Sequence, residues 1–435
     1  MAKKQNLILR TPKNQEISTA IAAQSFRNGE IHDWYRIVLG YSDHLVAKLL
    51  KDLKIKPGQK VLDPFCGSGT TLVECLKLGI ESVGIDANPS SWFAASVKTT
   101  WNLDIQILIK LLPQIESAYR KLMKQPTTLK KDKTFRYISS SGMSDRGWVS
   151  ARPLQKSIAL KIAISRLRTP KRYKDLLLLA LMTELVKTAS NMRFGPEIYC
   201  SKRKKDAPLL KHFDRRVRQM ASEITIAKNL PPCTAKVILG DSRNCASLLR
   251  KQGIRKVDAI LCSPPYPTEH DYTRNARLEL ALIESVFDKE SLQTIKRGMM
   301  RSHTKGIYKE DTDSDLMLEQ PDLMALVIKI DRKAKTKKHG FARLYSKVLN
   351  EYFGGMKRHL SSVYRVLTPG SPCAYVVGDQ SSYFRVHIPT ADILADIAAD
   401  CGFVRIKVKH WRQRWSSTTS RMINENILIA WKPSA

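Results

Sequence analysis

The sequence predicts an α/β fold built on a doubly wound, mostly parallel sheet. Two observations support this prediction. Short apolar runs at 60–62 and 82–85 flank a helical segment at 71–78, which is the pattern of a βαβ unit. Each run also ends at a carboxylate, Asp63 in the first and Asp86 in the second. Because open sheets of this kind bind ligands at the carboxyl ends of their strands, we expect a ligand site there.

Length and composition fit one α/β core with long insertions. The chain has 435 residues, of which 43% are hydrophobic, and a net charge of +34. A positive field of this strength favours a polyanionic partner, with nucleic acid the leading candidate. The chain has no apolar run long enough to span a bilayer and no secretory signal at its polar, basic start. Its eight cysteines form no CxxC pair, so we expect a cytoplasmic protein without a bound metal.

The chain alternates between sheet-like and insert-like stretches. Residues 101–240 contain 29 Lys and Arg but only 10 Asp and Glu. The resulting charge of 29 − 10 = +19 is more than half of the net charge of the chain. The expected organisation is a cofactor-binding half of the core at 17–100, a helical basic insert at 101–230, core strands with the second motif at 231–284, a variable charged insert at 285–345 and the C-terminal part of the core at 346–435. Expected helices are 17–53, 175–189, 209–224, 344–367 and 390–401, and expected strands are 235–239, 257–262, 373–377, 404–410 and 426–431.

The turn after the first strand has the features of a nucleotide-type cofactor site. Gly67 and Gly69 lack a Cβ, so a ligand can approach the backbone closely. Asp86 follows Gly67 by 19 residues and ends the next strand, where its carboxylate can accept both ribose hydroxyls. A tight structural turn would explain the glycines but not the two carboxylates at strand ends.

A second motif, Ser263-Pro264-Pro265-Tyr266, ends a later apolar strand. The Ser263 hydroxyl and the Pro264 carbonyl can each accept one N–H of an exocyclic amine. Two consecutive prolines pre-organise these acceptors, and Tyr266 can stack on a flat ring. The four residues together point to methyl transfer onto the amino group of a nucleobase, without a covalent intermediate.

Both motifs resemble those of the DNA amino-methyltransferases. Asp63–Thr71 resembles their S-adenosylmethionine (AdoMet) motif, D-P-F-x-G-S-G-T, and Asp241-Ser242 resembles the motif at the adenine amino group. The stretch 31–41 resembles the helix that covers the methionine end. The resemblance implies a class I AdoMet-methyltransferase fold, Rossmann-like with a seven-stranded sheet, in which 404–410 and 426–431 form the antiparallel edge pair. The cofactor residues it implies are Trp34, Asp63, Pro64, Phe65, Cys66, Gly67, Ser68, Gly69, Thr70, Asp86, Asp241 and Ser242.

Three of these residues are given particular roles. Asp63 would meet the positive end of the methionine moiety, and Phe65 would line the pocket. For Trp34, a place in the core as a buried aromatic residue is an equally good interpretation.

In the resembled family, S-P-P-Y favours cytosine N4 as the target, while D-P-P-Y and N-P-P-Y favour adenine N6. We therefore expect a cytosine-N4 DNA methyltransferase, with adenine N6 as the alternative.

The order of the motifs places most DNA recognition between them. The cofactor motif precedes the target motif with a long basic insert between, as in the alpha class of the family, so 101–230 is the first candidate region and 285–345 the second. The candidate DNA-binding residues are Lys202, Arg203, Lys204, Lys205, Tyr272 and Arg274. For Arg274, the solvated face of a helix is an equal interpretation. Duplex DNA is the expected partner, and a cognate restriction endonuclease of a restriction–modification system is a further candidate.

Other functional classes fit the sequence less well. An RNA amino-methyltransferase would share the motif pair, but no RRM or KH signature is present. A non-catalytic DNA-binding protein would not need both motifs intact, and we find no carboxylate–lysine constellation typical of a fused nuclease. Cys262 is not expected to act as a cytosine-C5 nucleophile, since those enzymes present Pro-Cys and here Cys262 precedes Ser263 at the end of a buried strand.

Overall fold

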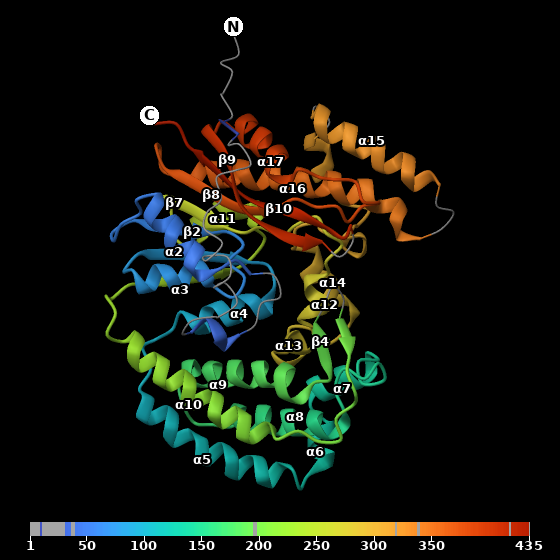
Figure 1. Cartoon of the computed structure of the whole chain (residues 1–435). Helices are drawn as coiled ribbons and strands as arrows, with labels where there is room; N and C mark the ends of the chain where they lie inside the picture. Colours follow the sequence, from blue (N-terminus) through green and yellow to red (C-terminus); the bar gives the residue numbers. More distant parts are fainter. Residues whose placement is uncertain are drawn as a thin grey trace.

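The computed structural model describes residues 9–10, 31–35, 40–194, 198–317, 320–336, 340–416 and 419–434. Figure 1 shows a twisted sheet with its covering helices and, below it, a layer of helices from the first insert. None of the helices in these described ranges is long and apolar enough to cross a membrane.

Seven strands form the central sheet, in the order β9-β10-β8-β7-β2-β3-β6. β10 is antiparallel to both of its neighbours, while the other pairs are parallel, and a two-residue β1 (Leu9–Arg10) lies beside β9. The bounds are β2 Lys60–Asp63, β3 Glu81–Asp86, β6 Ala235–Leu239, β7 Ala259–Cys262, β8 Pro372–Gly378, β9 Val404–Ser416 and β10 Arg421–Trp431. This arrangement is a doubly wound, mostly parallel α/β sheet, which confirms the predicted fold class.

Alternate residues of the central strands pack on opposite faces of the sheet. Leu62 and Ile260 join one hydrophobic cluster, whereas Val61, Ala259 and Leu261 join another. This alternation follows from the two-residue period of a strand. Because both faces are covered by helices, the strands read as continuous apolar runs.

Helices cover both faces of the sheet (Figure 1). One side carries α2 (Asp43–Asp52), α3 (Thr70–Lys77) and α4 (Pro89–Lys98), and the other carries α11 (Cys245–Lys251), α16 (Tyr345–Val366) and α17 (Thr390–Asp400). The expected helices at 344–367 and 390–401 therefore lie within one residue of their predicted bounds.

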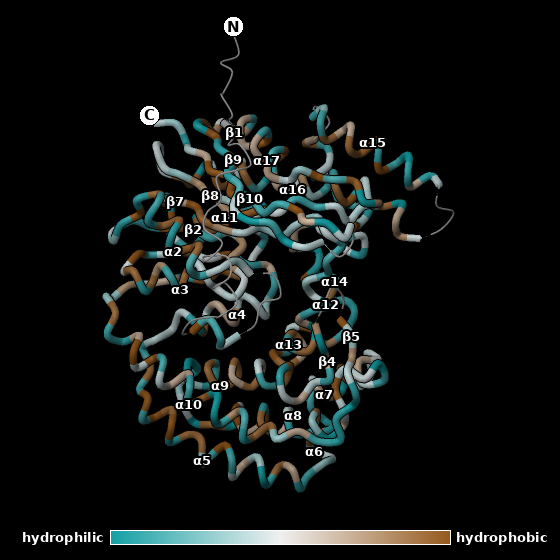
Figure 2. Tube along the Cα trace, viewed as in Figure 1, coloured by the Kyte–Doolittle hydropathy of each residue, from teal (hydrophilic) through white to brown (hydrophobic). Residues whose placement is uncertain are grey.

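The first insert is a helical layer with a short hairpin. Its elements are α5 Ile105–Leu122, α6 Pro126–Lys130, α7 Lys133–Ser140, α8 Ala151–Ser165, α9 Lys171–Glu184, a π-helical turn Leu185–Ala189, β4 Met192–Phe194, β5 Ile198–Cys200 and α10 Leu209–Ala227. Figure 2 shows hydrophobic stretches along α5 and α9. Their buried side chains form one cluster with those of α4 and of residues 276–286, so the insert shares a hydrophobic core with the part of the molecule built around the sheet.

Two short helices, α12 (Tyr272–Asn275) and α13 (Arg277–Leu282), follow the target motif. The second insert, 285–345, then leads to α16 and contains α14 (Lys289–Arg297), two 3₁₀ turns (Thr304–Gly306 and Asp313–Met317), α15 (Pro321–Lys335) and a final 3₁₀ turn, Phe341–Leu344. In Figure 1, α12, α13 and α14 lie between the sheet and the first insert.

The prediction of a continuous helix over 17–53 is wrong in its described part. Residues His32–Trp34 make a single 3₁₀ turn, Tyr35 is extended, and α2 begins only at Asp43. Residues 17–30 and 36–39 lie outside the described residues. The reason for the break is that side-chain contacts with the insert hold 31–35, as set out below.

Candidate active site

The two sequence motifs meet at the point where the strand order reverses. β2 pairs in parallel with β7, so the turn after Asp63 and the turn after Cys262 lie at the same edge of the sheet. β3 and β6 extend the sheet on one side of this pair and β8 on the other. Ligands bind at such a switch point, because the chain leaves adjacent strands in opposite directions and opens a crevice.

One cavity at this edge receives residues from both motifs. The cofactor half contributes Tyr35, Pro64, Phe65, Gly67, Asp86 and Ser242. The target half contributes Ser263, Pro264, Pro265, His270, Tyr272 and Asn275. The second insert closes a further side with Gly298, Met299 and Met300. Residues of the cofactor half and of the target half therefore line one continuous cavity.

Asp86 lies in this cavity with both carboxylate oxygens oriented by the backbone. Oδ2 accepts the N–H of Gly67 at 2.8 Å, and Oδ1 accepts the N–H of Asn88 at 2.8 Å. Burial raises the pKa of Asp86 to about 7, an effect that the two backbone hydrogen bonds oppose. Each oxygen keeps a lone pair that can accept a hydroxyl, as binding of a ribose requires.

Asp63, by contrast, is turned away from the cavity. It is 1% exposed, and its oxygens accept the N–H of Phe65 at 3.0 Å and the hydroxyls of Thr71 and Tyr41. Burial raises the pKa of Asp63 to about 7. Asp63 therefore stabilises the turn through these hydrogen bonds. It is not among the residues that line the cavity, where we expected it to meet the methionine moiety.

The glycine turn combines ligand access with tight packing. Gly67, with φ +53°, lines the cavity. Gly69 has φ +86°, and a Cβ on it would lie 3.1 Å from the Cβ of Ala95, so a larger residue would clash with α4. Ser68 faces inward and accepts a hydrogen bond from the buried Lys98 Nζ at 3.3 Å. Of Gly67, Ser68 and Gly69, only Gly67 thus lines the cavity.

The remaining residues of the turn also fall into two groups, those that line the cavity and those that pack within the fold. Pro64 and Phe65 line the cavity, and the Phe65 ring contacts that of His359 at 4.8 Å between centroids. Cys66 is buried beside Gly84, and burial raises the pKa of its thiol. Thr70 is the first residue of α3. Cys66, Ser68 and Thr70 are therefore placed to support the turn, while Pro64 and Phe65 are placed to contact a ligand.

Asp241 and Ser242 also have different positions. Ser242 lines the cavity, and its carbonyl lies 3.1 Å from Nδ1 of the buried His359. Asp241 forms an ion pair with Arg243, with 3.0 Å from the Arg243 Nε to each carboxylate oxygen. Arg243 in turn reaches Asp313 at 2.6 Å in the second insert. Asp241 is therefore committed to a bridge between the core and the insert.

For Trp34, the alternative of a buried core aromatic describes its position. Its side chain is fully buried, and its indole Nε1 donates to Glu223 of α10 at 2.7 Å. The neighbouring Tyr35 lines the cavity instead. Tyr35 could not be predicted as a cavity residue, because 31–35 was expected to be helical and Tyr35 is in fact extended.

Ser263, Pro264 and Pro265 line the cavity, but Tyr266 is not among the lining residues. The Tyr266 hydroxyl lies 3.3 Å from Ser263 Oγ and donates to the Val376 carbonyl at 3.4 Å. Its ring packs beside Gly378 of β8. Tyr266 is therefore placed to support Ser263 from behind rather than to stack on a ring in the cavity.

A different aromatic group faces the target half. Tyr272 lines the cavity, and the ring of His270 contacts it edge-on, with centroids 4.7 Å apart. Asn275 Nδ2 lies 2.6 Å from His270 Nε2, and both residues line the cavity. Arg274 is exposed on α12. The sequence showed these residues shortly after the S-P-P-Y motif, and we selected Tyr272 but neither His270 nor Asn275.

The basic loop in the first insert contains residues of two kinds. Lys202, Arg203 and Lys205 are exposed, although one Arg203 nitrogen also donates to the Asp145 carbonyl at 2.6 Å. Lys204 is half-buried, and its ammonium donates to the carbonyls of Thr188 and Ser190 at 2.7 and 2.5 Å. Lys204 therefore holds the chain after α9, while the other three are available to an anionic partner.

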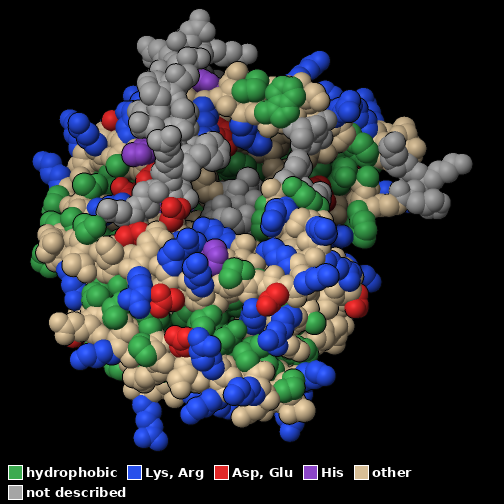
Figure 3. Space-filling model, turned by 60° about the horizontal axis from the view of Figure 1, so that its bottom comes forward, with side chains coloured by type: hydrophobic (Ala, Val, Ile, Leu, Met, Phe, Trp, Pro, Cys, Tyr) green, Lys and Arg blue, Asp and Glu red, His purple; other side chains and the backbone are tan. Residues whose placement is uncertain are grey.

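The wider surface of the insert is strongly basic. Figure 3 views the molecule from the side of the first insert, and Lys and Arg side chains are spread over this face far more densely than Asp and Glu. A surface of this charge attracts the phosphate backbone of a nucleic acid.

Comparisons with known proteins agree with this geometry. A family model described as a DNA methylase, of the N6/N4 methyltransferase type, matches residues 41–93, which contain β2, the glycine turn and Asp86. The Type II methyltransferase M.BsoBI of Geobacillus stearothermophilus is 24% identical, over 92% of this chain and 84% of its own length. M.AvaI of Nostoc sp. is 23% identical over 88% and 81%. M.MjaII of Methanocaldococcus jannaschii is 51% identical, over 22% of this chain and 18% of its own length.

The fold and the cavity have the features expected of a class I AdoMet-dependent methyltransferase. The chain resembles the DNA amino-methyltransferases of the N6/N4 type, which confirms the resemblance inferred from its motifs. AdoMet is its cofactor, and the residues of the cavity fit that group: Asp86 offers two oriented acceptors, and Gly67 leaves the backbone open beside them.

Proposed function

We propose that the chain methylates the exocyclic N4 amine of cytosine in duplex DNA. The observation that carries this proposal is the shared cavity, in which Gly67 and Asp86 face the same space as Ser263 and Pro264. The similarity to Type II methyltransferases over most of the chain supports DNA as the substrate.

The target half would orient the amine for attack. When bound, AdoMet supplies a methyl group activated by a positively charged sulfur. Ser263 Oγ and the Pro264 carbonyl each accept one N–H of the base, which draws the nitrogen lone pair out of conjugation with the ring. The two prolines fix the backbone, so the acceptors need not reorganise during the reaction. The Tyr266 hydroxyl, 3.3 Å from Ser263 Oγ, holds the serine side chain in place.

Tyr272 is the residue we propose to stack on the extruded base. Its half-buried ring lines the cavity next to His270. Extruding a base from the duplex costs a few kcal/mol, and stacking on an aromatic ring offsets part of this. This assignment replaces the stacking role that the sequence suggested for Tyr266, whose ring packs beside β8.

The basic inserts would bind the phosphate backbone of the duplex. We place most phosphate contacts on the first insert, with Lys202, Arg203 and Lys205 among the contacting groups. The enzyme would act on DNA in the bacterial cytoplasm, as part of a restriction–modification system with a cognate endonuclease or as an orphan methylase. The S-P-P-Y motif supports cytosine N4 as the target, and adenine N6 is the alternative.

Methyl incorporation tests the substrate class. Wild-type protein is incubated with methyl-labelled AdoMet and, separately, duplex DNA, tRNA or rRNA. We expect label in duplex DNA, incorporated about 10- to 100-fold more slowly by the Ser263→Ala protein, which should still bind AdoMet. Label in tRNA or rRNA with none in DNA would instead identify an RNA methyltransferase.

A further inference from the structure

We propose that Glu223, on α10 of the first insert, is a positioning residue of the cofactor pocket. It holds the segment 31–35, and so places Tyr35 at the cofactor side of the cavity. The inference rests on the proposed function, in that it takes this cavity as the AdoMet site. It assigns the helical insert a second role, beyond contact with nucleic acid.

The contacts of Glu223 are specific to this segment. Its Oε2 accepts the backbone N–H of Ile31 at 2.6 Å and the indole N–H of Trp34 at 2.7 Å. Its Oε1 accepts the side-chain amide of Gln219, one turn earlier on α10, at 2.8 Å. A single carboxylate therefore ties a backbone group and a side chain of 31–35 to a helix nearly 190 residues away in the sequence.

Other residues of the insert donate hydrogen bonds to backbone carbonyls of the segment 31–35. Thr183 Oγ1 on α9 donates to the Trp34 carbonyl at 2.5 Å. Arg216 on α10 donates to the Asp33 carbonyl at 3.4 Å and is fixed by an ion pair with Glu184 at 3.0 Å. The indole of Trp34 is buried in the hydrophobic cluster of the insert. Donors and acceptors of the insert thus replace the hydrogen bonds that a regular helix would have supplied.

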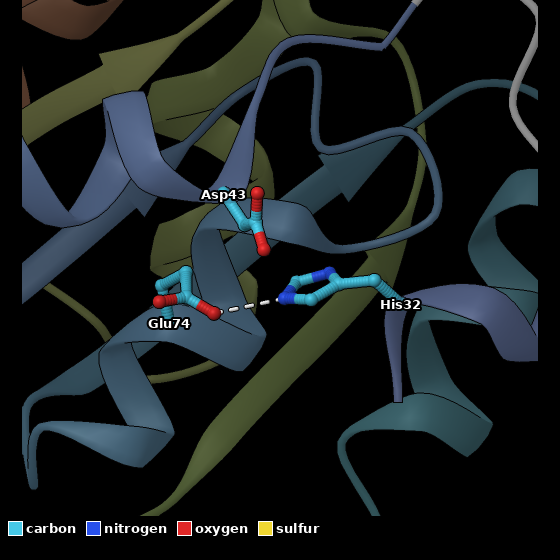
Figure 4. A group of neighbouring side chains, drawn as sticks. All are labelled: His32, Asp43 and Glu74. Carbon is cyan, nitrogen blue, oxygen red and sulfur yellow. Dashed lines mark hydrogen bonds and ion pairs between the residues drawn. The ribbon is translucent and has the colours of Figure 1, made fainter. Parts of the chain in front are cut away.

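The opposite side of the segment is attached to the core. Figure 4 shows His32 facing Glu74 of α3, at 2.8 Å between His32 Nε2 and Glu74 Oε1. Lys98 Nζ donates to the His32 carbonyl at 3.5 Å and to Ser68 Oγ in the glycine turn at 3.3 Å. The segment is therefore connected to the cofactor motif through Lys98.

A metal site is the other interpretation of the group in Figure 4. Ligand atoms of His32, Asp43 and Glu74 lie within 4.8 Å of one another. However, Lys77 Nζ lies 2.8 Å from the same Glu74 oxygen, and an ammonium there repels a divalent cation. We therefore interpret the group as the fastening of 31–35 to α3.

The position of Tyr35 depends on these contacts, because the segment has little structure of its own. It contains a single three-residue 3₁₀ turn, with Ile31 at φ +70° before it and Tyr35 extended after it. Such a turn does not persist without partners. Since the insert supplies Glu223, movement of the insert would change cofactor affinity, and bound cofactor would in turn bias the insert.

The test compares four variants with the wild-type protein. Glu223→Ala removes the acceptor, Glu223→Gln keeps an oxygen that can accept both N–H groups, and Trp34→Phe removes the indole donor but keeps a smaller aromatic ring in its place. Asp214→Ala is the matched control, since Asp214 lies on the same helix in an exposed ion pair with Arg218. AdoMet affinity is measured by calorimetry, KM for AdoMet and kcat by methyl transfer to DNA, and Tm by thermal unfolding.

We expect Glu223→Ala to bind AdoMet about tenfold more weakly and to raise KM for AdoMet to match, with kcat at saturating AdoMet within about twofold. Glu223→Gln should restore most of the affinity, and Asp214→Ala should behave as wild type. If Glu223→Ala does not fold, Trp34→Phe, with an expected loss of about threefold, decides the question.

Two results separate the possible failures. The positioning role would be overturned if both Glu223→Ala and Trp34→Phe bound AdoMet with wild-type affinity. It would also be overturned if these changes lowered Tm but left AdoMet affinity unchanged. A wild-type protein that neither binds AdoMet nor methylates DNA would instead overturn the proposed function.

Discussion

The backbone N–H of Gly67 donates to Oδ2 of Asp86 at 2.8 Å, so the turn after β2 is tied to the end of β3. The bond joins the two residues that we selected for cofactor binding from their spacing in the sequence. It also orients the carboxylate before any ligand arrives, which reduces the reorganisation needed on binding. The cofactor half is thus pre-formed around one glycine and one carboxylate.

We predict that AdoMet binding depends on Asp86 and on its ionisation. Asp86→Ala should weaken binding by about 2–4 kcal/mol at pH 8, since two hydrogen bonds to a charged group are lost. Burial raises the pKa of Asp86 to about 7, so the carboxylate gains its charge as the pH rises through 7. Wild-type affinity measured by calorimetry should therefore rise from pH 6 to pH 8, and Asp86→Asn should flatten this rise. Unchanged affinity in Asp86→Ala would place the cofactor elsewhere.

We predict that Asp63 makes stability depend on pH. Burial raises the pKa of Asp63 to about 7 in the folded protein, while the unfolded carboxyl ionises near pH 4. Between these values the unfolded state releases a proton that the folded state keeps, so this group lowers stability as pH rises from 4 to 7. Asp63→Asn should flatten the dependence of Tm on pH over that range. An identical slope in both proteins would show that Asp63 is charged in the fold.

We predict that the target half acts in methyl transfer and not in cofactor binding. Ser263→Ala should lower kcat by about 10- to 100-fold with AdoMet affinity within about twofold, because one oriented acceptor is lost. Tyr272→Ala should weaken binding of DNA that carries an extruded base by about 1–3 kcal/mol. Tyr266→Phe, which keeps the ring and removes the hydroxyl, should lower kcat less than Ser263→Ala. A larger binding loss in Tyr266→Ala than in Tyr272→Ala would return the stacking role to Tyr266.

We predict two kinds of effect from the basic loop. Changing Lys202, Arg203 and Lys205 to Ser should weaken binding to all DNA sequences, and each lost contact should reduce the log–log salt slope by about 0.9. Lys204→Met should lower Tm without changing that slope, since its ammonium donates to the carbonyls of Thr188 and Ser190. Titrations of fluorescent duplexes across salt concentrations measure the slope. A slope that the triple change leaves intact would place this loop away from DNA.

We predict that Cys262 has no chemical role. It is fully buried at the end of β7, and burial raises the pKa of its thiol well above the usual range, so no reactive thiolate is available. Cys262→Ser should retain methylation within about tenfold of wild type, the loss reflecting packing alone. Abolished turnover in a folded Cys262→Ser protein would point to a covalent mechanism.

The sequence predicted the fold class and the strand ends that position the cavity, because both depend on local signals. The expected strand at 235–239 and the position of each motif at the end of a strand rest on apolar runs and turn residues alone. The antiparallel edge pair was likewise confirmed, although β9 continues to Ser416 and β10 begins at Arg421, since the added residues of both strands are mostly polar.

What the sequence could not predict depends on long-range contacts. Asp63 and Asp86 each end a strand, yet only Asp86 faces the cavity, because Thr71 and Tyr41 draw Asp63 inward. The extended conformation of Tyr35 follows from partners on α9 and α10 that no local pattern reveals. Lys204 is likewise distinguished from its basic neighbours only by the carbonyls it meets in the fold.

The most direct test of the central claim is the identity of the methylated nucleoside. Duplex DNA is incubated with the wild-type protein and AdoMet, digested to nucleosides and analysed by mass spectrometry. We predict N4-methylcytosine, because Ser263 and Pro264 line the cavity in which the amine would be held. N6-methyladenine would keep the mechanism and contradict the assigned base, whereas 5-methylcytosine would contradict amino-methyl transfer altogether.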